Sequence, residues 1–287
     1  MTALWQRWTV FTGRQMDSRP LHLVRVFIAL AILGDLVAMA RRDVLPWILY
    51  PGELGGLVMH PSSWYLFEGA VWAGPALWVI AGAAGVLVAV GVGVRPAMVV
   101  LLLAYAQLGH LYIPGDRGID RILRTVMLLL IFSGSTGSQP SKTVAAWPAD
   151  LIRWLLMLVY LSAGVAKFGA RPGWHALETP ELYQIVCSPT TGRLDGMFWY
   201  DYGPLFALGG VGAIVLELSA VLLVTRFSRY WAVLGALLHI GLIFTVELGM
   251  FPFGMLALYP VLFGPWTGRM LDRLDPWLVG DWRGPEP

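Results

Sequence analysis

Long apolar stretches follow one another along most of this chain. A helix needs about 20 residues to cross the hydrocarbon core of a bilayer, and eight windows reach or approach that length. The pattern predicts an all-α fold, a polytopic transmembrane helical bundle of about eight spans. The fourth and eighth windows are the shortest, so seven spans are the alternative. The windows cover residues 22–41, 70–93, 96–114, 119–134, 149–168, 204–225, 230–248 and 250–265.

The composition supports a membrane protein and excludes an ordinary soluble domain. Of 287 residues, 57% are hydrophobic and 13% are charged, and the mean hydropathy is +0.66, far from the usual balance of soluble proteins. No linker divides the chain, so we expect one bundle over residues 21–265, between an N-terminal segment, 1–20, and a short tail, 266–287. The only cysteine, Cys187, excludes an internal disulfide.

The basic residues predict an orientation, because Lys and Arg in short loops favour the cytoplasm. With the N-terminus inside, ten Lys and Arg fall in cytoplasmic segments and five in outer segments. Both termini are therefore expected to be cytoplasmic. We expect no removable signal peptide, because the first twenty residues hold three arginines but no apolar core before a cleavage site. The chain suits a bacterial inner membrane, with lipid as a partner and no nucleic acid.

The two longest outer connections, 42–69 and 169–203, are rich in aromatic residues. Aromatic side chains concentrate at membrane interfaces. These connections are therefore expected either to anchor the protein in the headgroup layer or to fold over the bundle as a lid.

Lys167 lies near the end of an apolar run, LLMLVYLSAGVAKF, without an acid nearby in the sequence. A cation inside the bilayer costs about 2.5 to 3.5 kcal/mol on insertion scales, and such residues usually face the protein interior and serve a function. The alternative is that the side chain extends to the nearby interface. Arg153, Tyr160 and Lys167 recur every seven residues and so share one face of a helix.

Other ionisable residues within the windows also require partners. Glu217 lies in the middle of its span, where an ion pair with an arginine such as Arg25 or Arg153 is one explanation and a proton relay is the other. His239 is also mid-span, and His110 lies near the outer end of the third window. Ion pairs are expected at the start of the fourth window, among Asp116, Asp120, Arg121 and Arg124.

A buried lysine could act as a base. Burial disfavours the charged amine, and a neutral amine can take a proton from an acidic hydroxyl such as that of a hydroquinone. The same residues would also serve a proton-coupled carrier. No metal-binding or nucleotide-binding motif accompanies them, so no metal is predicted.

Several segments together resemble a known family. The stretch YLSAGVAKFGARPGW, from Tyr160 to Trp174, is similar to the Tyr-x-x-Ala-Gly-x-x-Lys segment of the vitamin K-dependent gamma-carboxylases and their bacterial relatives, the horizontally transferred transmembrane domain (HTTM) proteins. Glu217 resembles the membrane glutamate of that family. HIGLIFTVELGMFPF, beginning at His239, resembles its His-containing helix. The resemblance covers roughly residues 20–265.

The resemblance implies a mechanism and a set of site residues. It assigns Lys167 as the base that deprotonates a reduced quinone, of the menaquinol or vitamin K hydroquinone type. Tyr160 would orient the lysine, and Glu217 and His239 would relay protons or stabilise charge. His110, Arg153 and Trp174 complete the candidate set, as substrate-binding residues.

The chain also departs from the carboxylases. Their large luminal region is not matched, because this sequence has about twenty residues after its last predicted span, and Ala166 replaces a lysine before Lys167. We therefore expect a carboxylase-like or epoxidase-like membrane enzyme that acts on a quinol or another lipophilic substrate rather than on protein glutamate. The alternative is a non-catalytic accessory subunit with a membrane partner protein, or a proton-coupled carrier.

Overall fold

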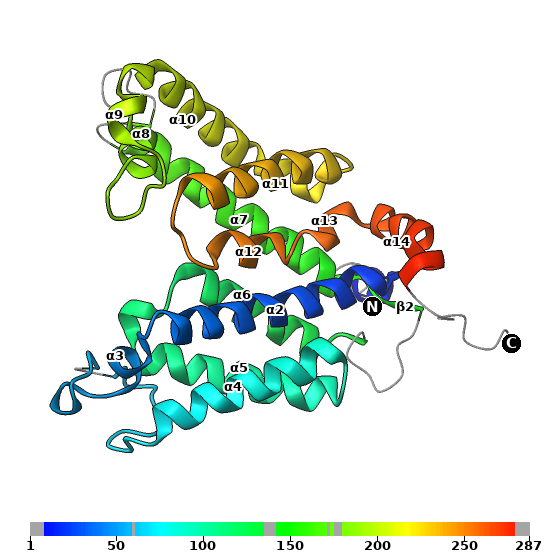
Figure 1. Cartoon of the computed structure of the whole chain (residues 1–287). Helices are drawn as coiled ribbons and strands as arrows, with labels where there is room; N and C mark the ends of the chain where they lie inside the picture. The colour runs from blue at the N-terminus through cyan, green and yellow to red at the C-terminus, as the bar shows by residue number, and fades with distance from the viewer. Residues whose placement is uncertain (1–8, 59–60, 135–141, 171–172, 175–179, 279–287) are drawn as a thin grey trace, which may run out of the picture.

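The structure is a computed structural model that describes residues 9–58, 61–134, 142–170, 173–174 and 180–278. These residues form a long bundle of helices with one two-stranded sheet (Figure 1). The predicted all-α polytopic fold is confirmed.

Within the described ranges, six helices are long and apolar enough to cross a membrane. Each corresponds to one predicted window, and the last but one continues from an α-helix into a 3-10 helix. They are α2 (Arg19–Arg41), α4 (Ala73–Val90), α5 (Val94–Leu111), α7 (Trp147–Gly169), α10 (Gly203–Leu218) with η5 (Ser219–Val224), and α11 (Ser228–Thr245).

The two shortest windows form shorter elements. The fourth window contains α6 (Gly118–Ile131), and the eighth contains α12 (Phe251–Leu256) and α13 (Pro260–Phe263). At about 1.5 Å per residue, none of these is a full membrane-spanning helix. The described residues therefore form six long spans, with α6 in the fourth window and α12 and α13 in the eighth, against the eight or seven spans that the pattern predicted.

The helices form two groups on either side of the segment α12–α13 (Figure 1). One group contains α2, α4, α5 and α6, and the other contains α7, α10, η5 and α11. The segment α12–α13 lies between them, in contact with α2, α6, α7 and α11. It is also largely buried, which explains how a broken helix is tolerated at this depth.

Side chains satisfy backbone carbonyls near the C-terminal end of α13, where the segment α12–α13 ends. Arg153 of α7 donates to the carbonyl oxygen of Val261 from Nε at 3.0 Å and from Nη2 at 2.6 Å. Ser228, at the start of α11, donates to the carbonyl oxygen of Leu262 at 3.0 Å. An unpaired carbonyl in a bilayer costs several kcal/mol, so these contacts hold α7 and α11 against the broken segment.

One end of the bundle gathers the two chain termini. Strand β1 (Gln15–Asp17) pairs antiparallel with β2 (Thr143–Ala145), and Arg19 forms an ion pair with Asp272 of α14 (Pro265–Leu278). The segment predicted as a tail is thus helical through Leu278. Because these contacts join the N-terminal, central and C-terminal segments, we call this the terminal end.

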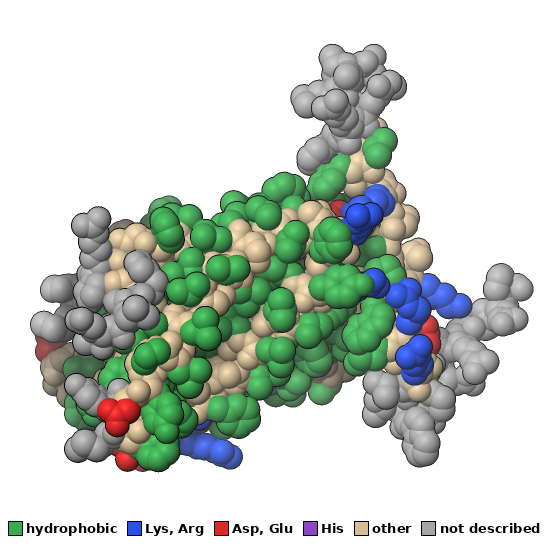
Figure 2. All heavy atoms as spheres, turned by 90° about the horizontal axis from the view of Figure 1, so that it is seen from above, with side chains coloured by type: hydrophobic (Ala, Val, Ile, Leu, Met, Phe, Trp, Pro, Cys, Tyr) green, Lys and Arg blue, Asp and Glu red, His purple; other side chains and the backbone are tan. Residues whose placement is uncertain are grey.

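Charge is distributed unevenly along the bundle. In Figure 2 apolar side chains cover the length of one face, and most visible Lys and Arg side chains gather at the terminal end. Four exposed arginines at this end have no carboxylate partner among the described residues: Arg226, Arg229, Arg269 and Arg273. This distribution agrees with a cytoplasmic terminal end, which stays a prediction.

The opposite end contains the short elements of the two aromatic connections. These are α3 (Leu45–Leu49) and η1 (Gly52–Leu54) in the first connection, and α8 (Glu181–Val186), α9 (Gly196–Trp199) and η4 (Tyr200–Tyr202) in the second. The turn η2 (Ile113–Gly115), between α5 and α6, lies at this end as well. Tyr65 is buried, whereas Trp64 is 74% exposed. The connections therefore combine packing over the bundle with exposed aromatic side chains suited to an interface.

An ion-pair cluster joins three segments at this opposite end. Glu247 accepts hydrogen bonds from Arg42, which follows α2, and from Arg193, which follows α8. These bonds hold the pKa of the Glu247 carboxyl below its ordinary value of 4.5. The cluster fastens the connection after α8 to the end of α11, where Gly192 also bridges Val246.

Glu247→Gln should reduce the pH dependence of stability in acid. A carboxyl whose pKa is lower in the folded state contributes stability above its unfolded pKa, and this contribution is lost as the pH falls through the folded value. The loss should be below about 1 kcal/mol, because the pair is exposed and screened. Thermal midpoints between about pH 7 and pH 3 measure it. The matched control is Glu53→Gln, and equal pH profiles for Glu247→Gln and wild type would contradict the prediction.

Candidate functional site

Lys167 and Glu217 form an ion pair between α7 and α10. The Lys167 amine lies 2.6 Å from Oε1 and 2.8 Å from Oε2 of the Glu217 carboxylate. Gly164 lets the two helices approach, because an added Cβ there would lie 3.0 Å from the Glu217 Cβ. The arginine partners considered for Glu217, Arg25 and Arg153, are wrong: its partner is the lysine.

The pair lies at the edge of the bundle rather than deep within it. The Glu217 side chain is 7% exposed and the Lys167 side chain 21%, so the amine is the more accessible partner. On the same helix Val165 and Phe168 are more than half exposed and face the lipid. A lipophilic molecule could therefore reach the amine from the bilayer.

Trp174 covers the amine from the aromatic connection after α7. The Lys167 nitrogen lies 4.9 Å from the centre of the Trp174 ring, within the range of a cation–π interaction. The Trp174 backbone packs against α10 at Gly210, where any side chain would collide with the Trp174 carbonyl. This close contact positions the indole beside the ion pair.

A second cluster lies deeper on the same face of α7. The Tyr160 hydroxyl is 2.6 Å from Nε2 of His239 on α11 and 2.8 Å from the Tyr259 hydroxyl. All three residues are buried. Nδ1 of His239 is buried without a hydrogen-bond partner among the described residues, so one polar atom of this cluster stays unsatisfied.

Tyr259 and Trp231 were not selected from the sequence. The Trp231 ring packs edge-on against Tyr160 with centroids 4.7 Å apart, and its Nε1 donates to the Leu216 carbonyl oxygen at 3.0 Å. Trp231 thus connects the tyrosine cluster to the helix that carries Glu217. The sequence did contain a sign of Tyr259: a residue with a polar hydroxyl group, next to Pro260, within an otherwise apolar window.

Two of the candidate residues do not join this site. Arg153 bonds the Val261 carbonyl and lies 3.3 Å from Asp150, fourteen residues, or about 21 Å of helix, before Lys167. His110 lies in the other helix group, where its Nδ1 is 2.9 Å from the Ser62 hydroxyl. Both therefore have structural partners away from the lysine.

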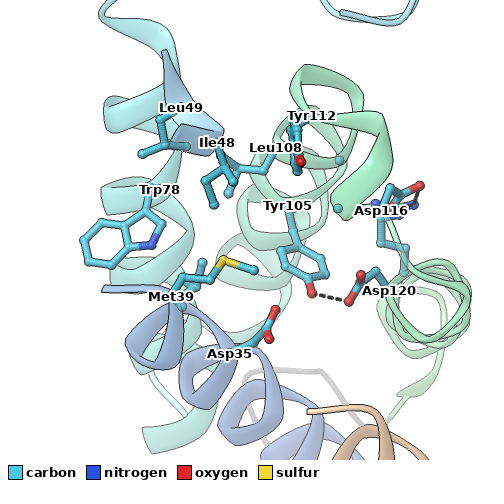
Figure 3. Close-up of a pocket in the computed structure, with 14 residues that line it drawn as sticks. Asp35, Met39, Ile48, Leu49, Trp78, Tyr105, Leu108, Tyr112, Asp116 and Asp120 are labelled. Carbon is cyan, nitrogen blue, oxygen red and sulfur yellow. Dashed lines mark hydrogen bonds and ion pairs between the residues drawn. The ribbon is translucent and has the colours of Figure 1, made fainter. Parts of the chain in front are cut away.

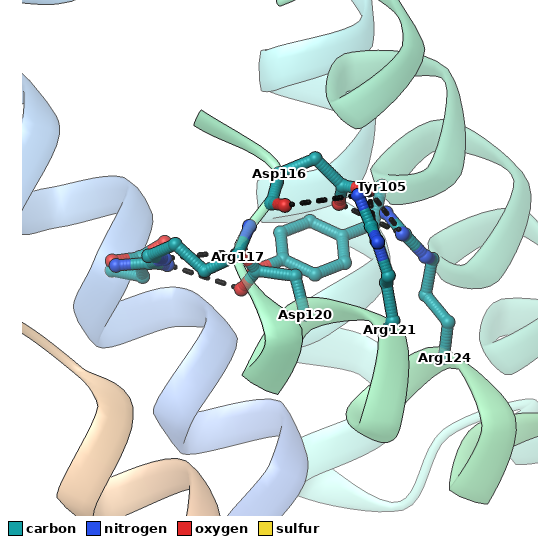
Figure 4. Close-up of polar contacts among 7 residues, drawn as sticks. Tyr105, Asp116, Arg117, Asp120, Arg121 and Arg124 are labelled. Atoms are coloured by element: carbon teal, nitrogen blue, oxygen red, sulfur yellow. Dashed lines mark hydrogen bonds and ion pairs between the residues drawn. The ribbon is translucent and has the colours of Figure 1, made fainter. Parts of the chain in front are cut away.

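A separate polar network occupies that other group. Arg117 bonds Asp120 from Nε at 3.0 Å and Asp35 of α2 from Nη2 at 2.5 Å, and Tyr105 donates to Asp120 at 2.6 Å. Figure 4 shows the Arg117 side chain reaching across to α2. Asp116 pairs with Arg121 and Arg124, so these two arginines have ion-pair partners, as expected. The partner of Asp120, however, is Arg117.

A cavity of about 60 Å³ lies beside this network, between α2, α3, α4, α5 and α6 (Figure 3). The carboxylates of Asp35 and Asp120 line it, together with Trp78, whose buried Nε1 has no partner among the described residues. Such a volume admits a few water molecules but not a quinone ring. This cavity is thus unsuited to the predicted substrate, and it is not lined by Lys167.

Comparison with known protein families identifies part of the chain. Residues 133–266 match the HTTM domain. The match covers slightly less than half of the chain and supports the HTTM family; we call these residues the HTTM segment. No curated protein and no solved structure matches the chain.

The HTTM segment contains both clusters of the candidate site. The ion pair with Trp174 and the tyrosine–histidine cluster lie within it, whereas His110 and the Arg117 network lie outside. No group of metal-binding side chains occurs among the described residues. The segment therefore brings a lysine, a glutamate and a tryptophan together in one region.

The two tyrosine hydroxyls of this cluster should contribute unequally to the free energy of unfolding. Tyr160→Phe leaves both Tyr259 and Nε2 of His239 unpaired, whereas Tyr259→Phe preserves the bond from Tyr160 to His239. We expect a loss of roughly 1–3 kcal/mol for the first variant and less than about 1 kcal/mol for the second. Unfolding in mixed detergent micelles measures the free energy of unfolding of both variants. Equal losses would contradict the arrangement in which Tyr160 bonds both Tyr259 and His239.

Proposed function

We propose that this protein is an integral membrane enzyme of the carboxylase-like type that acts on a quinol or another lipophilic substrate. The observation that carries the proposal is the Lys167–Glu217 pair, with Trp174 over the amine and lipid-facing side chains on the same helix. The match of the HTTM segment supports it. A general base is the role that this amine fits best.

The ion pair can interconvert with a neutral pair. Transfer of one proton from the Lys167 ammonium to the Glu217 carboxylate gives an amine and a carboxylic acid, with no change in net charge. Low dielectric surroundings favour the neutral pair relative to water, because ions lose their solvation there. Glu217 can thus hold the proton that Lys167 must lose before it acts as a base.

The neutral amine can then take a proton from an acidic hydroxyl of the substrate. The nitrogen becomes an ammonium again, and the substrate oxygen keeps the electron pair of the broken O–H bond. A reduced quinone would supply such a hydroxyl together with reducing power. The Trp174 ring offers a surface for a flat ring, and the exposed Val165 and Phe168 suit an isoprenoid tail.

The tyrosine cluster supports this site from within. Tyr160 lies two turns before Lys167 on the same face of α7, and Trp231 links it to the Glu217 helix. Tyr160 and His239 are too buried to meet a substrate that stays at the lysine edge. Their proposed role is to position the two helices. Nδ1 of His239, which has no hydrogen-bond partner among the described residues, can in addition accept or donate a proton in a relay.

Substitution of Lys167 tests the proposal. Lys167→Ala should lower turnover roughly 10²- to 10⁴-fold, the usual contribution of a general base. Lys167→Arg preserves the positive charge beside Glu217, but arginine stays protonated, so we expect a similar loss. Oxygen-dependent oxidation of reduced menaquinone by the purified protein is the assay, with quinone retained on purification measured by mass spectrometry.

Two outcomes would overturn the proposal. Full turnover by Lys167→Arg would show that charge, rather than proton transfer, is what the site needs. If wild type and Lys167→Ala both lack bound quinone and turnover, while each retains the same protein partner, the accessory-subunit alternative replaces catalysis. The control is Arg269→Gln, which alters an exposed cation of α14 away from the proposed site.

A further inference from the structure

Arg25 is a cation of α2 that the site described above does not use. Its Nε atom is buried and has no hydrogen-bond partner among the described residues. The head of the side chain lies against Gly91, in the turn between α4 and α5: an added Cβ on Gly91 would lie 3.8 Å from Nη2 and 3.9 Å from Nη1. Arg25 is therefore packed against protein without being paired.

Three other cations within the bundle have carboxylate partners. Arg124, Arg153 and Lys167 each lie within ion-pair distance of a carboxylate. No described carboxylate lies within that distance of Arg25. Nε of Arg25 is buried, whereas the residue as a whole is half-buried. A cation within a membrane span is costly without a partner, so we expect a group outside the chain to complete the pairing.

The position of Arg25 indicates where that group must come from. Helix α2 begins at Arg19, and Arg25 lies six residues, or about 9 Å of helix, further on. Helical side chains lean toward the N-terminus, which brings the guanidinium back toward the level at which α4 ends and α5 begins. That level is the terminal end of the bundle (Figure 1), where the spans leave the hydrocarbon layer.

The adjoining turn favours an anion as well. Gly91 and Gly93 both have positive φ angles, and Gly93 precedes α5 without a side-chain cap. The start of this helix carries the positive end of its dipole, and a glycine turn leaves room for a headgroup. The unpaired guanidinium and the start of α5 therefore both favour an anion at this turn.

We propose that Arg25 and the Gly91–Gly93 turn bind the phosphate of a phospholipid in the leaflet at the terminal end. A guanidinium binds phosphate through two parallel hydrogen bonds. Phosphate is also the anion that a bilayer itself provides where spans end. The site lies outside the HTTM segment and does not depend on the chemistry of Lys167.

Lipid binding to delipidated protein tests this site. Native mass spectrometry would follow titrations with phosphatidylglycerol, phosphatidylcholine, diacylglycerol and inorganic phosphate. We expect wild type to bind one phosphatidylglycerol more tightly than the phosphate-free diacylglycerol. Arg25→Gln should weaken this binding by roughly tenfold or more, since a hydrogen bond to a charged group contributes about 1.5–3 kcal/mol. Arg25→Lys, which retains the charge but not the paired geometry, should lie between.

A matched control separates a specific site from general surface charge. Arg226 is an exposed arginine at the same end, over the ring of Phe227, and Arg226→Gln should leave the tightest lipid in place. Equal weakening by Arg226→Gln, or unchanged binding by Arg25→Gln, would overturn the proposal. If inorganic phosphate binds as tightly as phosphatidylglycerol, the proposal that the bound phosphate belongs to a lipid is overturned. If Arg25→Gln does not fold, Arg25→Lys decides between these outcomes.

Discussion

The structure depends on how charges are neutralised inside an apolar layer. An isolated charge in that layer is costly, so each buried cation needs a partner that the fold must bring to it. Lys167 receives Glu217 from another helix, Arg117 receives Asp35 and Asp120, and Arg153 receives a backbone carbonyl. These contacts fix which helices are neighbours. They also explain why the charged residues lie on the faces that point inward.

The broken segment α12–α13 joins the two groups of helices. Its central position is tolerable only because Arg153 and Ser228 occupy its free carbonyls and because apolar residues surround it. Tyr259, within the same segment, extends the hydrogen bonds of Tyr160 and His239. The segment thus supports the interior of the candidate site, while the ion pair beside Trp174 stays near the lipid. This division separates positioning residues from the residue proposed to react.

The sequence predicted the fold class and part of the site. Six of the eight apolar windows form long spans among the described residues, because membrane thickness sets the length of a span; the two shortest windows do not. The seven-residue spacing placed Tyr160 and Lys167 on one inward face of α7, since that spacing is close to two helical turns. It also included Arg153 on that face. The spacing could not show that Arg153 lies about 21 Å of helix away from Lys167 and bonds the Val261 carbonyl instead. The arginine partner predicted for Glu217 was also wrong, because which residues pair between two helices depends on how the helices pack.

The sequence by itself determined that this chain crosses a membrane, which residues are costly to bury, and that these residues need partners. Those results follow from local composition and the helical period, which need no knowledge of neighbours. Only the tertiary structure decided which partner each residue receives. Gly164 allows α7 to approach α10 at Glu217, and Gly210 admits the Trp174 backbone. Among the described residues no carboxylate reaches Arg25, which local composition could not show, because contacts between helices join residues that are remote in sequence.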